Sequence, residues 1–176
     1  QIYAKSAPTV SEAGYAMGLG FSPQIFTALL MPSAVSLAIT ITISGKYIDK
    51  VGRRIWLIWT TVGVALFGLV LPYFLENGTT LSLFWFLIIG MGLIGMGYGP
   101  LASFLPELFP THARYSGASL TYNIAGLFGA SVAAIIALPL NANYGLKGVG
   151  IYLTLNAVLS LIGLWFITET RDRQLL

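Results

Sequence analysis

The sequence contains no cysteine and very little charge. Of its 176 residues, nine are Lys or Arg, six are Asp or Glu, and one, His112, is histidine. Without cysteine the chain forms no disulfide framework, thiolate nucleophile or cysteine-based metal site. A single histidine in a proline-flanked segment supplies neither a catalytic constellation nor a metal ligand set. We therefore expect no enzyme, no catalytic residue, no metal and no cofactor.

The scarcity of charge also indicates which solvent surrounds the folded chain. Hydrophobic residues make up 56% of the chain and charged residues only 9%, whereas soluble domains are about a quarter charged. A soluble domain of this size needs a charged exterior that this sequence does not provide. The net charge of +3 lacks the dense basic stripe of a nucleic-acid-binding protein. Lipid is the solvent that tolerates such a surface, so the bilayer is the first expected partner.

The apolar residues are arranged in long runs. A helix crosses the hydrocarbon core with about 20 apolar residues, and no charged side chain lies in the central part of the runs found here. The first run is rich in hydroxyl side chains and is expected to face other helices or a cavity rather than lipid. The fold class predicted is an all-α polytopic transmembrane bundle with five spans, at residues 25–44, 55–75, 81–105, 118–138 and 149–167.

The linkers differ sharply in charge. Seven of the nine basic residues lie in 45–54, 111–117 and the tail 169–176, which alternation places on one side of the membrane. The opposite side has only Lys5 and Lys147. Because basic loops stay in the cytoplasm, we predict a cytoplasmic C-terminus and an extracytoplasmic segment 1–24. This leading segment is neither a span nor a signal peptide, which favours a cut within a larger membrane protein.

Small residues recur in the third and fourth spans. Gly95 and Gly99 are four residues apart, and Gly126 and Ala130 begin a similar series. Such spacing predicts faces where helix backbones approach closely in lipid. Glycine also lets helices bend or slide, and the two interpretations are compatible.

The segment between the first two spans reads GKYIDKVGRR (45–54). We expect Gly45 to end the first helix and Gly52 to adopt positive φ in a tight turn. Asp49, the only acid in this stretch, is able to pair with a neighbouring base or to cap a helix N-terminus. From composition alone, a solvated basic loop explains the segment equally well.

This segment resembles the signature loop between helices 8 and 9 of the major facilitator superfamily. The stretch PELFPTHARYSGAS (106–119) resembles the loop between helices 10 and 11 of its metabolite–proton symporter family, which includes transporters of dicarboxylates, shikimate, and proline or betaine. The tail ETRD (169–172) is similar to the segment that follows helix 12. The resemblance implies a twelve-helix transporter whose helices 8 to 12 are the five spans, with helix 7 preceding Gln1.

The resemblance also implies a mechanism. Two six-helix halves surround a central cavity, and this chain has the missing N-terminal half as a partner, with a small polar metabolite and protons as the transported species. The family's cytoplasmic charge network stabilises one state of the transporter. Carried onto this sequence, its members are Gly45, Asp49, Gly52, Arg53, Arg54, Glu107 and Arg114.

Candidate substrate contacts are polar residues within the spans, because transporter sites lie near the midplane. They are Ser36, Thr40, Tyr98, Tyr122 and Asn123. The alternatives are a simple helix–helix hydrogen bond for the asparagine and an interfacial position for the tyrosines. No acid lies mid-membrane, so any proton-carrying carboxylate is expected in the other half.

Competing functions are a sugar or drug facilitator of the same superfamily and a channel or scaffold subunit. The expected location is the bacterial cytoplasmic membrane. Without the other half, the polar cavity face has no partner, so we expect the isolated chain to be unstable.

Overall fold

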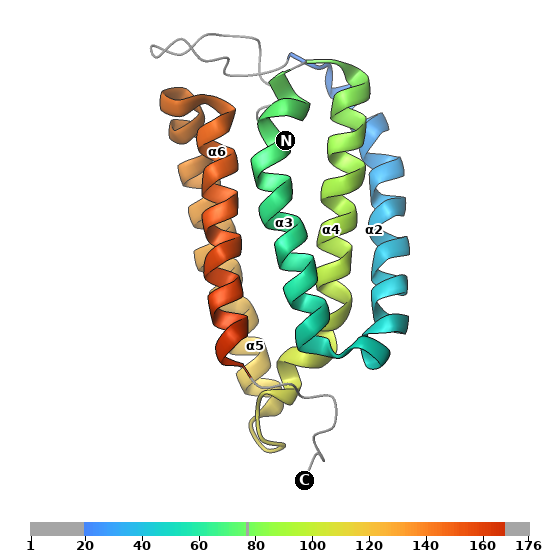
Figure 1. Cartoon of the computed structure of the whole chain (residues 1–176), viewed down its shortest axis with the longest axis vertical. Coiled ribbons are helices and arrows are strands. Elements are labelled where there is room, and N and C mark those ends of the chain that lie inside the picture. Colours follow the sequence, from blue (N-terminus) through green and yellow to red (C-terminus); the bar gives the residue numbers. More distant parts are fainter. Residues whose placement is uncertain (1–19, 77, 168–176) are drawn as a thin grey trace.

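The computed structural model describes residues 20–76 and 78–167, apart from the side chains at positions 49 and 134. All regular structure in these residues is helical, which confirms the predicted all-α bundle (Figure 1). The predicted segments 1–24 and 169–176 lie largely or wholly outside the described residues. The elements are α2 (Pro23–Val51), α3 (Arg53–Glu76), α4 (Thr80–Glu107), α5 (Arg114–Ala125), the π-helical η1 (Gly126–Ser131) and α6 (Val132–Phe166).

The first helix is longer than predicted, and the expectation that Gly45 ends it is wrong. α2 continues through Gly45 to Val51. The reversal into α3 needs one residue only, Gly52, whose φ is 101°. Its N–H donates to the Ile48 carbonyl at 2.9 Å, and its own carbonyl accepts from Trp56 N at 3.1 Å. Because both neighbouring helices keep their hydrogen bonds, the predicted loop shrinks to a single-residue turn.

The last two predicted spans form one continuous stretch of helical residues. α5, η1 and α6 together cover 53 residues, about 80 Å of helix at 1.5 Å per residue. The stretch is interrupted by Gly145, with φ 65° and ψ −167°. The predicted linker 139–148 is therefore helical on both sides of this one glycine. The chain reverses there, and in Figure 1 the first leg is drawn behind the second.

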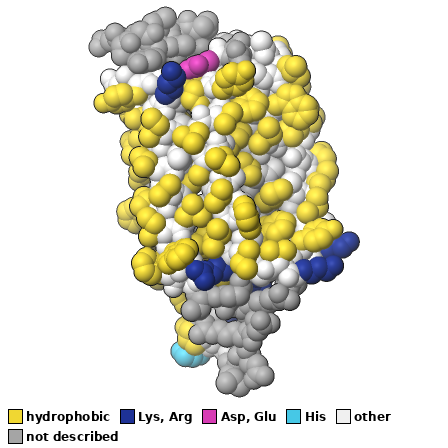
Figure 2. Space-filling model, viewed as in Figure 1, with side chains coloured by type: hydrophobic (Ala, Val, Ile, Leu, Met, Phe, Trp, Pro, Cys, Tyr) yellow, Lys and Arg dark blue, Asp and Glu magenta, His cyan; other side chains and the backbone are white. Residues whose placement is uncertain are grey.

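Four stretches are long and apolar enough to cross a membrane: Pro23–Ile48, Arg53–Glu76, Thr80–Glu107 and Arg114–Phe166. The reversal within the fourth accommodates the two spans predicted there. Hydrophobic side chains cover most of the face in Figure 2, and basic side chains gather near its lower end. This is the surface expected of a bundle whose solvent is lipid.

The main contacts join α2 to α4 and α3 to α6, with α3 and α4 also packed together. Between α2 and α4 the predicted close approach is confirmed. A Cβ on Gly95 would lie 2.6 Å from the Leu37 carbonyl oxygen, and one on Gly99 would overlap the Ser44 hydroxyl. A side chain at either position would force the two backbones apart.

The proline of α4 is compensated from a neighbouring helix. Pro100 is fully buried and α4 continues past it. Having no N–H, proline leaves the carbonyl four residues earlier without its helical donor. That carbonyl belongs to Met96, and it accepts a hydrogen bond from the Trp56 indole N–H of α3 at 3.0 Å. The carbonyl that Pro100 leaves without a donor in α4 therefore forms a hydrogen bond that joins α4 to α3.

Candidate functional site

The turn at Gly52 sends two consecutive arginines in different directions. Arg53 and Arg54 begin α3 at the end of the bundle where α2 and α4 finish and α5 starts. We call this the basic end, because five of the six basic residues that the structure describes lie there; they are Lys46, Lys50, Arg53, Arg54 and Arg114, and the sixth is Lys147. Consecutive helical residues point about 100° apart, so two neighbouring arginines reach different helices.

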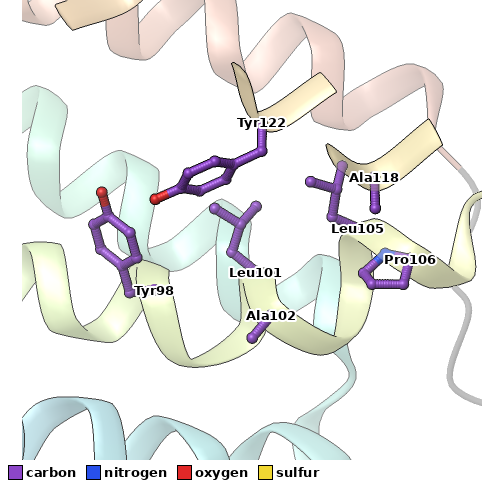
Figure 3. A pocket seen from close by; sticks show the side chains of 7 residues that line it. All are labelled: Tyr98, Leu101, Ala102, Leu105, Pro106, Ala118 and Tyr122. Atoms are coloured by element: carbon purple, nitrogen blue, oxygen red, sulfur yellow. The ribbon is translucent and has the colours of Figure 1, made fainter. Parts of the chain in front are cut away.

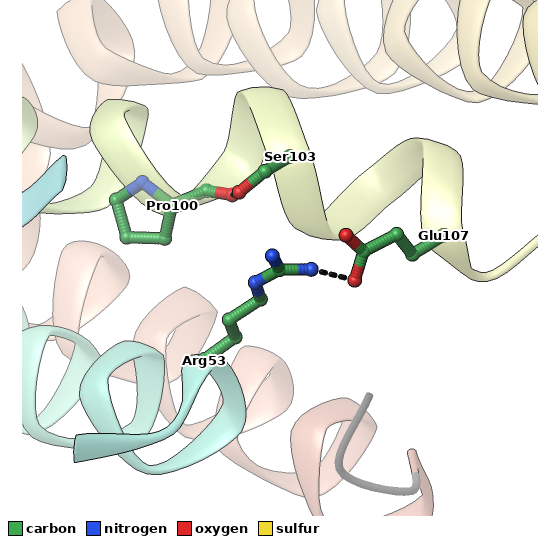
Figure 4. A network of polar contacts seen from close by, with 4 residues as sticks. All are labelled: Arg53, Pro100, Ser103 and Glu107. Carbon is green, nitrogen blue, oxygen red and sulfur yellow. Dashed lines mark hydrogen bonds and ion pairs between the residues drawn. The ribbon is translucent and has the colours of Figure 1, made fainter. Parts of the chain in front are cut away.

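Arg53 forms an ion pair with Glu107, the last residue of α4 (Figure 4). The side chains are only 17% and 14% exposed, respectively. Both charges have therefore given up most of their contact with solvent. In such surroundings the loss of one partner leaves a poorly hydrated charge, which is costly. The pair fixes the start of α3 to the end of α4.

Arg54 instead binds the end of α6. Its Nε and Nη2 donate to the carbonyls of Leu164 and Trp165, each at 2.9 Å. These carbonyls belong to the last turn of the helix, where no intrahelical donor remains and a positive charge is favourable. The two arginines of the predicted network thus have separate partners: one anchors α4 and the other caps α6.

The remaining members of the predicted network are less connected. Arg114 begins α5, and its Nε is buried with no hydrogen-bond partner among the described residues. The side chain of Asp49 is outside the description, so its pairing stays a prediction. Gly45 lies within α2, and nothing is within 4 Å of a Cβ built there. Gly52, in contrast, is required by its positive φ.

The connection from α4 to α5 contains a further glycine requirement that the sequence interpretation missed. A Cβ on Gly117 would overlap the ring of Phe109. The Gly117 N–H also donates to the Ala113 carbonyl at 2.8 Å. An aromatic residue eight positions before a glycine is a weak sequence signal, because it does not say that the chain folds back between them.

Two of the candidate substrate contacts take part in helix packing. The Ser36 hydroxyl donates across the interface to the Ile88 carbonyl of α4 at 3.1 Å. The Thr40 hydroxyl bonds back to α2, to the Ser36 carbonyl at 2.9 Å and the Leu37 carbonyl at 3.0 Å. Both residues therefore belong to the α2–α4 contact.

Of the other three candidates, Tyr98 and Tyr122 lie together where α5 faces α4. Tyr98 and Tyr122 line a pocket of about 350 Å³, and their hydroxyl groups point toward one another (Figure 3). Both tyrosines are about half exposed. Asn123 follows on α5, is exposed, and donates from Nδ2 to the Ser119 carbonyl at 2.8 Å. The other lining residues are Leu101, Ala102, Leu105, Pro106 and Ala118.

The helix changes character directly after this group. η1 widens to π-helical geometry, and within the described structure nothing lies within 4 Å of a Cβ built at Gly126 or Gly129. The packing predicted for the glycine series of this span is therefore not made within the described residues. Asn123, Gly126 and Gly129 are all exposed, so the described residues leave this part of the helix open. No group of three potential metal ligands occurs among the described residues.

Comparison with known proteins identifies the family of the chain. Residues 14–176 match the family described as sugar (and other) transporter. Two Haemophilus influenzae proteins named as metabolite transport proteins are 91% and 54% identical over 99% and 98% of the chain. The Escherichia coli inner membrane metabolite transport protein YhjE is 40% identical over 95% of it.

A more distant relative is the proline/betaine transporter of Salmonella typhimurium, 32% identical over 76% of the chain. The chain spans about two fifths of the length of the first three relatives: 39%, 39% and 38%. No solved structure matches it.

Proposed function

Because the chain belongs to the sugar (and other) transporter family of the major facilitator superfamily, we propose that it is part of a proton-coupled symporter for a small polar metabolite. Its described helices then correspond to helices 8 to 12 of the C-terminal half. The relatives are transporters rather than enzymes. Transport proceeds by alternating access, in which the two halves rock around a central site.

The observation that carries this proposal is the ion pair between Arg53 and Glu107 at the basic end. It joins the start of α3 to the end of α4 within this half, at the end of the bundle where the family's charge network is expected. Because both side chains are mostly buried, the pair holds this end of the half in one arrangement and weakens when water enters. Residues of the network thus set a population of states rather than contact the solute. Positive-inside orientation puts this end in the cytoplasm.

The open surface of α5 and η1 is proposed as cavity wall facing the other half of the transporter. Tyr98, Tyr122 and Asn123 present phenol and amide groups there, which suit a small polar solute. Related proteins named for transport of proline and betaine support a solute of that size and polarity. The proton-carrying group belongs to the other half, because no described span has an acidic residue in its central part.

A facilitator is the second candidate, favoured by the family's description as a sugar transporter. One experiment separates the two: uptake of labelled proline, betaine, shikimate, organic acids and a sugar by cells expressing the full-length transporter, with and without an uncoupler. Accumulation of one solute that collapses with the uncoupler is expected for the symporter. Uptake that only equilibrates and ignores the uncoupler would establish the facilitator.

A further inference from the structure

The end of the bundle opposite the basic end has a groove between α3 and α6. Its floor is formed by Gly68 and Pro72, which are buried. The walls are side chains that point outward: Leu69 is 60% exposed, Tyr73 73% and Ile151 56%. The groove holds about 370 Å³ and is bounded at its mouth by Glu76 and Lys147.

Close backbone contact between the two helices makes the groove shallow and narrow. A Cβ on Gly150 would overlap the backbone oxygen of Gly68, so these glycines allow α3 and α6 to touch. Thr154 reinforces the contact by donating to the Ala65 carbonyl at 3.1 Å. Larger apolar side chains lie on both sides of this backbone contact between α3 and α6 and form the walls of the groove.

Two residues of opposite charge lie at the mouth of the groove. Glu76 is the last residue of α3, and Lys147 lies two residues after the reversal at Gly145. Both are exposed, and no ion pair or hydrogen bond joins either to another described residue. Figure 2 shows an acidic and a basic side chain beside each other at the end of the bundle opposite the basic end. Among the described residues, neither charge therefore has a salt-bridge partner.

On α3, the acidic residue and the apolar wall of the groove lie on one face of the helix. Leu66, Leu69, Tyr73 and Glu76 recur at helical spacing on α3, and Leu66 is 58% exposed. The occupant must therefore be apolar along most of its length and have a charge of each sign at one end. An ordinary solute fails the first condition, and a hydrocarbon fails the second.

We propose that this groove binds a zwitterionic phospholipid with an ethanolamine headgroup. The ammonium group contacts the Glu76 carboxylate, the phosphate contacts the Lys147 ammonium, and an acyl chain lies between Leu69, Tyr73 and Ile151. Glu76 and Lys147 lie at helix ends, at the depth of the headgroups, and Tyr73 lies one turn further in, where interfacial aromatics gather. A primary ammonium also donates hydrogen bonds to a carboxylate.

The test uses the full-length transporter, purified in mild detergent and titrated with defined phospholipids by native mass spectrometry. Wild type should bind phosphatidylethanolamine more tightly than phosphatidylglycerol. Lys147→Gln should weaken both by roughly fivefold, the effect of one interfacial charge. Glu76→Gln should weaken only the ethanolamine lipid and so erase the preference. The control Lys46→Gln, at the basic end, should match wild type.

Two results would overturn the proposal. One is an unchanged headgroup preference in Glu76→Gln together with an unchanged lipid affinity in Lys147→Gln, provided that both variants unfold at the wild-type temperature in lipid-free detergent. The other is displacement of the lipid by glycerophosphoethanolamine, which has the headgroup and no acyl chains, at concentrations similar to the lipid's own. That result would make the groove a site for a soluble zwitterion.

Discussion

The α2–α4 contact and the α5–η1 surface both contain glycine at helical spacing, yet they differ in every other respect. In the first, Gly95 and Gly99 press against the backbone of α2. In the second, the space around Gly126 and Gly129 is open within the described structure. The same residue type thus serves a closed interface in one place and an open face in another. Stability should depend on the first region, and transport on the second.

The largest effect is expected at the closed interface. Replacing Gly99 by Val puts side-chain atoms where the Ser44 hydroxyl and the Ile41 carbonyl lie, so α2 and α4 must separate. Overpacking costs about 1–3 kcal/mol in ordinary cores, and backbone contact leaves less room for relaxation. We expect the full-length transporter to lose its monodisperse peak in size-exclusion chromatography.

The matched comparison is Gly99→Ala with Gly129→Ala in η1, because the Cβ added at Gly129 meets no described atom and should leave the peak intact. Equal losses from the two variants would remove the distinction between closed and open glycines. Ser44→Ala, which removes the hydroxyl that faces Gly99, should partly restore a Gly99→Ala variant.

An intermediate effect is expected from variants at the basic end, where two neighbouring arginines of one motif can be compared. Arg53→Gln leaves Glu107 half-desolvated without its partner, a situation that costs about 3–5 kcal/mol for fully buried pairs and less here. Arg54→Gln removes two hydrogen bonds to the last turn of α6, about 1–3 kcal/mol. The first variant should change the population of transport states, and the second should mainly loosen α6.

Uptake by cells and thermal unfolding in detergent separate these effects. Arg53→Gln should reduce uptake more than its fall in unfolding temperature explains, and the exchanged pair Arg53→Glu with Glu107→Arg should recover part of it. Arg54→Gln should lower the unfolding temperature with a proportionate loss of uptake. Indistinguishable behaviour of the two variants would argue against separate tasks for the two arginines.

Much of this architecture could be predicted from the sequence, because the length of an apolar run and the charge of a linker depend only on neighbouring residues along the chain. The all-helical apolar bundle and the close-approach glycines of α4 were predicted in this way, as was the positive φ of Gly52. The end of α2 was misplaced because glycine permits a helix end without requiring one, as Gly45 illustrates. The links from Trp56 to Met96 and from Arg54 to α6 join residues 40 and 110 positions apart, and local patterns carry no information about such pairing.

The smallest effect on stability is expected on the open face, where it tests the proposed cavity wall. Asn123→Ala removes two hydrogen bonds to Ser119 of its own helix, and Tyr122→Phe removes one half-exposed hydroxyl. Exposed changes of this kind alter stability by about 0.5 kcal/mol or less. If these groups contact the solute, each variant should nevertheless raise the KM for uptake, because a polar group of the solute is left without its partner. The matched control is Asn143→Ala, an exposed amide that donates to the Pro139 carbonyl at 2.8 Å near the opposite end. A KM that changes in the control as much as at Asn123 would show that the open surface of α5 is lipid-facing or structural rather than part of the transport path.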